Sequence, residues 1–290
     1  MKFLQILKTF ILSVLGILLM GGLPVLVSGL AQNEWRFRQY WMTIGEIIDA
    51  ILHPSGLTYK VIGGQKERDL FPYLWEPIQY SLTVLFSSFF LSMLMAALLT
   101  IFTMMFSEKI RDSIKFVFYL FESLPDLLII LLLQLALLYS YKQTGAVLVG
   151  IAATYEEKIY VLPIIVLSIL PTIQLYRLTI MTFEKEEKKD YVLLAKSIGL
   201  GRLFILIVHI LRNAVISVFF QSKKTVWFML SNLFVVELLF NIPGITRFLM
   251  ATLQPKLFTL ALLSIFVPLF LFYNLGEYIL SRKANRGEEL

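Results

Sequence analysis

Residues 160–200 read YVLPIIVLSILPTIQLYRLTIMTFEKEEKKDYVLLAKSIGL, and this stretch changes character half-way. Up to Thr182 it is almost wholly apolar, and it is about as long as the roughly 20 residues that a helix needs to cross a bilayer. From Glu184 onward it is densely charged, which the hydrocarbon core does not accept without cost. The stretch therefore predicts a membrane-spanning helix that is followed by a polar segment at one membrane surface.

Five further apolar segments are long enough to cross a bilayer, and helix is the expected form because a lone strand cannot satisfy its backbone in lipid. The six predicted spans are 10–30, 77–106, 116–141, 160–182, 214–240 and 257–280. We therefore predict an all-α membrane protein with six transmembrane helices. Its expected divisions are a first helix (1–30), an extracytoplasmic loop (31–76), a five-helix core (77–281) and a cytoplasmic tail (282–290).

The composition supports this class. Apolar residues make up 58% of the chain, charged residues 16%, and the mean hydropathy is +0.78. Soluble proteins are nearer 45–50% apolar and about 25% charged, so a soluble enzyme and a nucleic-acid-binding domain are not the leading classes. The net charge of +6 lies in short patches between the apolar runs. There are no cysteines and only two widely separated histidines, so we predict no metal site and no cofactor.

The first apolar segment has a second interpretation. Lys2 and Lys8 precede it, and residues 29–31 (Gly-Leu-Ala) resemble a signal-peptide cleavage site. The run is longer than the usual h-region of about 7–15 residues, which favours a membrane span over a signal peptide.

Lysines and arginines fall mostly in the short loops on the side of the N-terminus, so both termini are predicted to be cytoplasmic. Most of the remaining ones lie in the long external loop, where charge orients a chain weakly. In that loop, residues 34–41 interleave aromatic residues with arginines. This pattern suits either a helix at the lipid headgroups or a contact with an external partner protein.

The polar segment 184–213 predicts two short helices joined by a glycine turn. Gly199 is expected to end the first helix, and the second begins near Arg202. Four apolar residues of the first helix recur at helical spacing, namely Tyr191, Leu194, Ala195 and Ile198. This apolar face requires a cover, which is either the chain's own helix ends or a separate soluble subunit.

The same segment resembles a known family. The run Asp190-Tyr191-Val192 … Ala195 … Gly199-Leu200 … 209–214 (HILRNA) is similar to the EAA loop of ABC-importer membrane subunits, above all those of the dipeptide/oligopeptide/nickel permeases. The similarity continues in order through 235–237 (VVE), 243–244 (PG) and 274–278 (NLGEY). The chain departs from the family pattern after the first span, where a PGDP-like signature is missing, and at Lys223 and Lys224, which replace small or apolar residues.

The resemblance implies a permease subunit, not an enzyme, that forms half of the translocation path for peptides or a similar solute in a bacterial cell membrane. Its expected partners are ABC ATPase subunits at the cytoplasmic face, a second permease subunit and an extracytoplasmic solute-binding protein. The chain has no GxxxxGK[ST] loop for nucleotide phosphates, so ATP hydrolysis is expected on a partner. By their place in the motif, five residues would couple to the ATPase: Asp190, Tyr191, Ala195, Gly199 and Leu200. Asp190 either pairs with a basic residue of the ATPase or solvates the helix.

Four ionisable residues at membrane depth are candidates for the translocation path, because such residues are costly in lipid and usually functional. Lys223 and Lys224 lie well inside the predicted fifth span, where an intramembrane salt bridge or a misplaced span are the alternatives. Arg177 lies near a cytoplasmic helix end and could extend to the interface instead. Glu237 lies near the external end, where it could act in gating or reach the interface.

Two other functions compete with an ABC permease. A secondary transporter driven by an ion gradient often has repeated halves, but the first three and last three spans show no convincing repeat. A membrane scaffold that transports nothing is the other alternative.

Overall fold

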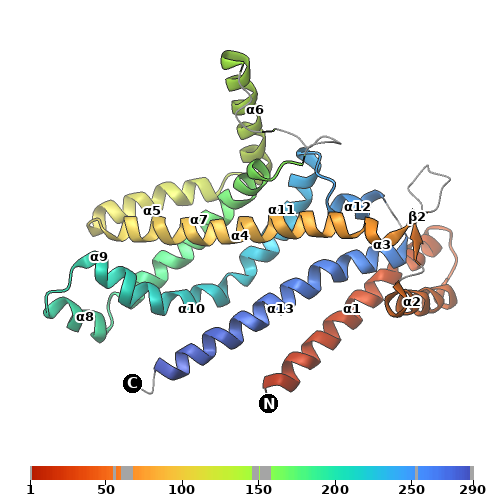
Figure 1. Cartoon of the computed structure of the whole chain (residues 1–290), viewed down its shortest axis with the longest axis horizontal. Helices are drawn as coiled ribbons and strands as arrows, with labels where there is room; N and C mark the ends of the chain where they lie inside the picture. The colour runs from red at the N-terminus through yellow and green to blue at the C-terminus, as the bar shows by residue number, and fades with distance from the viewer. Residues whose placement is uncertain are drawn as a thin grey trace. The chain divides into compact units, whose positions relative to one another are not determined.

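A computed structural model describes residues 2–54, 57–59, 68–145, 150, 158–251 and 254–287. Helices make up nearly all of the described chain (Figure 1). The elements in order are α1 (Lys2–Ala31), α2 (Phe37–Leu52), β1 (Thr58–Tyr59), β2 (Arg68–Asp69), α3 (Leu70–Tyr73), α4 (Trp75–Met104), α5 (Glu108–Glu122), α6 (Asp126–Thr144), α7 (Val161–Glu186), α8 (Asp190–Ser197), α9 (Arg202–Phe204), the π-helix η2 (Ile205–Leu211), α10 (Arg212–Gln221), α11 (Lys223–Leu239), α12 (Ile245–Ala251) and α13 (Pro255–Gly287). They form two compact units. The first unit comprises Met1–Leu82 and Pro243–Leu290, and the second comprises Thr83–Ile242.

Six helices among the described residues are long and apolar enough to cross a membrane. They are Leu4–Ala31, Trp75–Met104, Asp126–Thr144, Val161–Glu186, Arg202–Gln221 and Pro255–Leu280. The predicted all-α class with six spans is thus confirmed, and the short antiparallel pair of β1 and β2 is the one sheet within the described residues.

The bounds of two predicted spans were wrong. The third was expected at 116–141, but α5 ends at Glu122 and α6 begins at Asp126. Pro125 causes this break, because proline has no N–H to donate and disfavours a helical residue before it. The fifth was expected at 214–240, but the apolar helix already begins at Arg202, and a turn at Ser222 separates α10 from α11.

The external loop predicted at 31–76 contains most of the small elements of the first unit. Its α2 buries four residues at helical spacing, Tyr40, Ile44, Ile47 and Ala50, and this helix packs against α1 and α13. Gly22 of α1 allows the close approach, because a Cβ there would lie 2.7 Å from the Tyr40 ring. The Tyr40 hydroxyl also donates to the Leu19 carbonyl at 3.1 Å.

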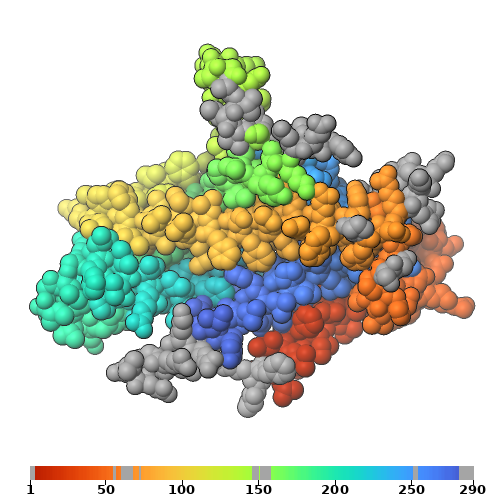
Figure 2. Space-filling model, in the orientation of Figure 1, coloured from red at the N-terminus to blue at the C-terminus, as the bar shows by residue number. Residues whose placement is uncertain are grey.

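In the second unit, small polar residues join α4 to α7. The hydroxyls of Ser88 and Ser92 donate to the carbonyls of Ile164 and Ser168, both at 3.1 Å. Such residues let two helices approach closely where water is absent. By contrast, Ile130 is the one buried residue of α6, and most of this helix projects from the rest of the unit (Figure 2).

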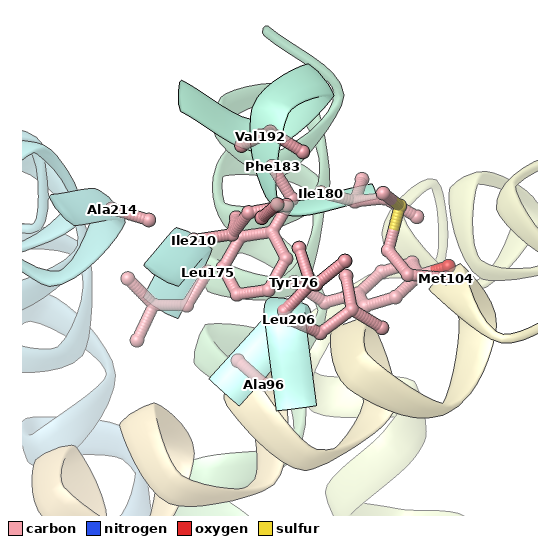
Figure 3. Packing of buried hydrophobic residues seen from close by; sticks show 12 residues of the cluster. Ala96, Met104, Leu175, Tyr176, Ile180, Phe183, Val192, Leu206, Ile210 and Ala214 are labelled. Atoms are coloured by element: carbon pink, nitrogen blue, oxygen red, sulfur yellow. The ribbon is translucent and has the colours of Figure 1, made fainter. Parts of the chain in front are cut away.

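The core of the second unit reaches the polar segment after α7. Buried side chains of α7 (Leu175, Tyr176, Ile180 and Phe183) pack with Val192 and Ala195 of α8 and with residues of η2 (Figure 3). The Tyr176 hydroxyl also donates to Thr103 of α4 at 3.1 Å. The short helices after α7 are therefore anchored to the end of a membrane helix through a continuous apolar core.

Candidate functional site

The candidate site is the turn formed by α8, Gly199 and α9, which we call the elbow (residues 190–204). Its first helix begins after Lys189, whose backbone is extended, and Asp190 occupies the first turn. A carboxylate there is favoured by the positive end of the helix dipole. Asp190 is exposed, so its charge faces outward from the elbow.

Gly199 ends α8 as the sequence predicts. Its φ is +84°, in the left-handed region. The Leu200 N–H donates to the Ala195 carbonyl at 3.2 Å, and the Gly199 N–H donates to the Lys196 carbonyl at 3.1 Å. These two bonds define a Schellman motif, in which glycine is favoured because a side chain is strained at positive φ.

Replacing Gly199 with valine should destabilise the elbow by about 1–2 kcal/mol or more, since a β-branched residue resists this backbone conformation. Gly201 is the matched control. A Cβ on either glycine meets no described atom within 4 Å, but Gly201 has φ −63°, which valine accepts. Amide hydrogen exchange of the elbow should therefore rise in Gly199→Val and not in Gly201→Val. Equal exchange in the two variants would show that backbone strain is not what fixes the turn.

The elbow turns one face inward and one outward. Val192 and Ala195 are buried, and Tyr191 and Leu200 are partly buried against the core. Three apolar residues stay exposed, two in α8 and one at its C-cap, and we call them the elbow patch: Leu193 (52%), Leu194 (64%) and Ile198 (68%).

The predicted apolar face was therefore partly wrong. It placed Leu194 and Ile198 beside Ala195, and it omitted Val192. The reason is that residues 191–195 (YVLLA) are all apolar or aromatic, so periodicity alone does not select the inward side. As a result, part of the apolar surface is covered by the chain itself and part is left uncovered.

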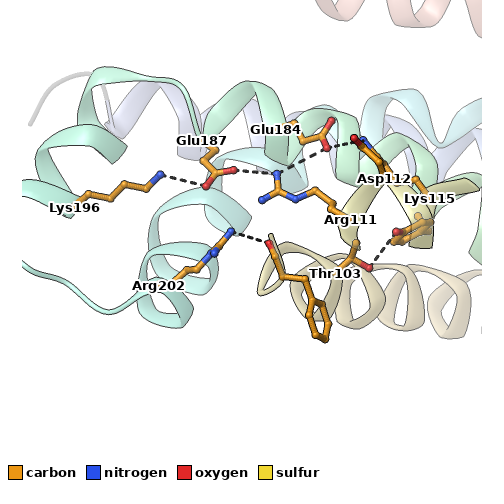
Figure 4. Close-up of polar contacts among 10 residues, drawn as sticks. Thr103, Arg111, Asp112, Lys115, Glu184, Glu187, Lys196 and Arg202 are labelled. Carbon is orange, nitrogen blue, oxygen red and sulfur yellow. Dashed lines mark hydrogen bonds and ion pairs between the residues drawn. The ribbon is translucent and has the colours of Figure 1, made fainter. Parts of the chain in front are cut away.

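Ion pairs connect α5 to the end of α7 and to the elbow (Figure 4). The Arg111 guanidinium, with its side chain only 7% exposed, lies 3.2 Å from Glu187 and 3.9 Å from Glu184. The Lys115 ammonium lies 2.9 Å from Glu184. The Lys196 ammonium of α8 lies 3.2 Å from Glu187. We call these five residues the ion-pair cluster.

The ion-pair cluster was not predicted, because the charged run before α8 was expected only to form part of a polar segment at the membrane surface. A usable signal exists in the sequence. Arg111 and Lys115 are four residues apart, and Glu184 and Glu187 are three apart, so each pair occupies one helix face. Matching two such faces of opposite charge would have indicated a contact between α5 and the end of α7.

Glu187 of the cluster stays ionised around neutral pH. Burial acts to raise the pKa of Glu187, but Lys196 and Arg111 outweigh it and hold that pKa below the ordinary 4.5. The stabilisation that ionised Glu187 contributes is therefore present above its ordinary pKa of 4.5, and it is lost as the pH falls through the lowered pKa of the folded protein. Burial and the bond to Glu186 raise the pKa of Tyr191 to about 12. Its hydroxyl accordingly stays protonated and donates to Glu186 at 2.7 Å.

The four candidate path residues occupy different environments. Arg177 pairs with Glu122 of α5 at 3.0 Å and lies over the Tyr119 ring, 5.9 Å from its centroid. Glu237 is fully buried in α11. Lys223 and Lys224 are both exposed at the start of α11.

A protein-family model matches most of the chain. The family model described as "Binding-protein-dependent transport system inner membrane component" matches residues 72–286, which include the elbow, the ion-pair cluster and α11. The chain belongs to this family. Its members are membrane components, in agreement with the six apolar helices.

Individual relatives match a shorter part. The dipeptide transport system permease protein DppB of Escherichia coli K12 is 33% identical over 96 residues, which are 33% of this chain and 28% of that protein. DppB of Haemophilus influenzae is 33% identical over 109 residues (37% and 33%). DppB of Bacillus subtilis is 32% identical over 106 residues (36% and 34%). The match thus spans about a third of the length of these relatives.

Proposed function

We propose that this chain is a permease subunit of an ABC importer for peptides or a similar small solute. It forms half of a translocation path in a bacterial inner membrane, with both termini in the cytoplasm. A second permease subunit completes the path, and a solute-binding protein delivers the solute from outside. ATP hydrolysis takes place on separate ABC ATPase subunits, which bind the elbow.

The observation that carries the proposal is the elbow patch. Leu193, Leu194 and Ile198 are exposed on a helix whose opposite face is held in the core, so the patch has a fixed position. Apolar side chains in water favour burial by about 25 cal/mol per Å². A groove on a soluble subunit therefore gains free energy by covering them, with no loop to order beforehand.

The anchoring of the elbow suits it to transmit movement. Three of the five coupling residues (Tyr191, Ala195 and Leu200) support α8 from inside, while Asp190 and Gly199 lie at the surface. The ion-pair cluster joins α8 to α5, and helical backbone continues from Arg202 to Gln221. A partner that binds the patch more tightly in one conformational state than in another would shift the equilibrium toward that state. The size of this shift is set by the difference between the two binding free energies.

Reconstitution into liposomes tests the proposal. The chain, reconstituted with a second permease subunit, the ATPase and the binding protein, should take up a labelled peptide only when ATP is supplied, and the binding protein with peptide should stimulate ATP hydrolysis. Uptake that persists without ATP and collapses with a protonophore would instead show a gradient-driven transporter. ATP hydrolysis that never responds to solute would instead show a scaffold.

A further inference from the structure

The helix α2 has an exposed apolar face beside the face that it buries. Four large apolar residues, Phe37, Trp41, Ile48 and Leu52, are between 42% and 68% exposed. At 100° per residue they fall within an arc of about 60°, and no other residue of α2 falls within that arc. They run from the first residue of the helix to its last, a length of about 22 Å. We call this set the apolar stripe.

The other exposed side of α2 is mostly polar. It carries Arg38, Gln39, Glu46 and Asp49, and Met42 is its one large apolar residue. Around its axis the helix therefore has three sides, namely the buried side, the apolar stripe and this polar side.

The contacts of α2 place it near one end of two membrane helices. It packs against α1 and α13, beside the end of α1 that is away from the N-terminus (Figure 1). A Cβ on Gly21 of α1 would meet both Thr259 of α13 and Ile47 of α2. Thr259 lies only about 6 Å along α13 from its first residue, Pro255. Since α1 and α13 both contain candidate spans, α2 lies at the membrane surface opposite the two chain termini.

One ion pair indicates which side of α2 faces the water. The ammonium of Lys256, in the first turn of α13, lies 3.1 Å from the Glu46 carboxylate. Glu46 thus points toward the water-side end of α13, and the centre of the apolar stripe lies about 150° from Glu46 around the axis of α2. The stripe therefore faces the bilayer interior, and the polar side faces the water.

We infer that α2 is an interfacial helix whose apolar stripe inserts into the lipid leaflet at this surface, where Arg38 binds the phosphate of an anionic phospholipid. Lipid surrounds membrane helices such as α1 and α13, so the stripe continues a surface that lipid covers. Tryptophan is enriched at the membrane–water interface, and an amphipathic helix lies there with its apolar side toward the acyl chains. A soluble partner outside the membrane would meet the polar side of α2 and leave the stripe uncovered.

Arg38 is suited to the headgroup because of its position and its free charge. It lies about 40° beyond the edge of the apolar stripe, on the side that leads to water. It makes no ion pair with any side chain that the structure describes, whereas the neighbouring Arg36 pairs with Glu34 at 2.9 Å. A guanidinium binds phosphate through two parallel hydrogen bonds, which favours such a contact.

Fluorescence quenching in nanodiscs tests the insertion, with the chain assembled with its partner subunits. The chain has no cysteine, so each engineered thiol carries a unique bimane label. Phospholipids with a nitroxide near the top of the acyl chain should quench the label on Ile48→Cys at least about five times more than the label on Gln39→Cys, because an interfacial helix places only its apolar side at that depth. Iodide in the water should quench the two labels in the reverse order.

Two results would overturn the insertion. If iodide quenches both labels equally, the stripe faces water. If neither quencher reaches the Ile48→Cys label, a second permease subunit or the binding protein covers the stripe instead of lipid. The measurement needs no transport, so its outcome is independent of the proposed function.

A comparison of headgroups tests Arg38. With the label on Trp41→Cys, one turn from Arg38, nitroxide phosphatidylglycerol should quench about twice as strongly as nitroxide phosphatidylcholine, because an arginine prefers a lipid with net negative charge. The ratio should fall to about one when Arg38→Gln is added, and Arg38→Lys should retain it, since lysine also binds phosphate. A ratio of one with Arg38 present, or a ratio that survives Arg38→Gln, would overturn the assignment of Arg38.

Discussion

Replacing both Leu194 and Ile198 with aspartate should lower the affinity of the permease for its ATPase by at least about 100-fold. These side chains are 64% and 68% exposed, so most of their apolar surface is available to a partner. Burying one such side chain contributes about 1.5–3 kcal/mol, and 1.4 kcal/mol is a factor of ten in affinity. The two carboxylates would in addition lose hydration on entering an apolar groove.

The fold of the permease should survive this change, since neither side chain belongs to the core. Co-purification in mild detergent, followed by titration with the isolated ATPase, measures the effect. The control is Leu194→Met with Ile198→Val, which keeps the surface apolar and should bind within a few-fold of the wild type. Undiminished binding by the double aspartate variant would mean that the ATPase docks elsewhere.

Removal of the Arg111 side chain should cost about 3–5 kcal/mol of stability, because it leaves partly buried carboxylates without their main partner. The Arg111 side chain is 7% exposed, and Glu187 beside it is 20% exposed. Arg177→Ala is the matched control. Its pair with Glu122 has the same chemistry, but the Arg177 side chain is 53% exposed, so its loss should cost less than about 1 kcal/mol.

The free energy of unfolding in mixed detergent micelles measures the difference between the two variants. Hydrogen exchange shows which helices are destabilised, and exchange in the Arg111→Ala variant should rise at α5 and the elbow. Equal destabilisation by both substitutions would show that the ion-pair cluster holds the elbow no more firmly than a surface pair does. Added salt should weaken the Arg177 pair more than the cluster, because salt screens exposed charges best.

The long apolar runs were the most predictable part of the fold, since a chain in lipid must form helices to satisfy its backbone. Gly199 was also predictable, because a helix end with positive φ favours one residue type. Both features depend on residues that are close together in the sequence, so the sequence alone is enough to predict them.

The errors came from places where the sequence permits two structures. The apolar run 191–195 fits either face, and only the core beneath Val192 selects one. The charged residues at the end of α7 could be solvated or could form ion pairs within the chain. The position of Arg111, 3.2 Å from Glu187, shows that they form ion pairs.

Cross-linking from a single thiol at the elbow tests the central claim most directly. Ile198→Cys, with a short thiol-reactive photo-cross-linker, should join the permease to the ATPase in native membranes, and Thr144→Cys at the end of α6 should not. The cross-link should map to a groove on the ATPase surface and should change in yield when ATP is bound. If Ile198→Cys gives no adduct with the ATPase while Thr144→Cys gives one, the elbow is not the docking site and the account is contradicted.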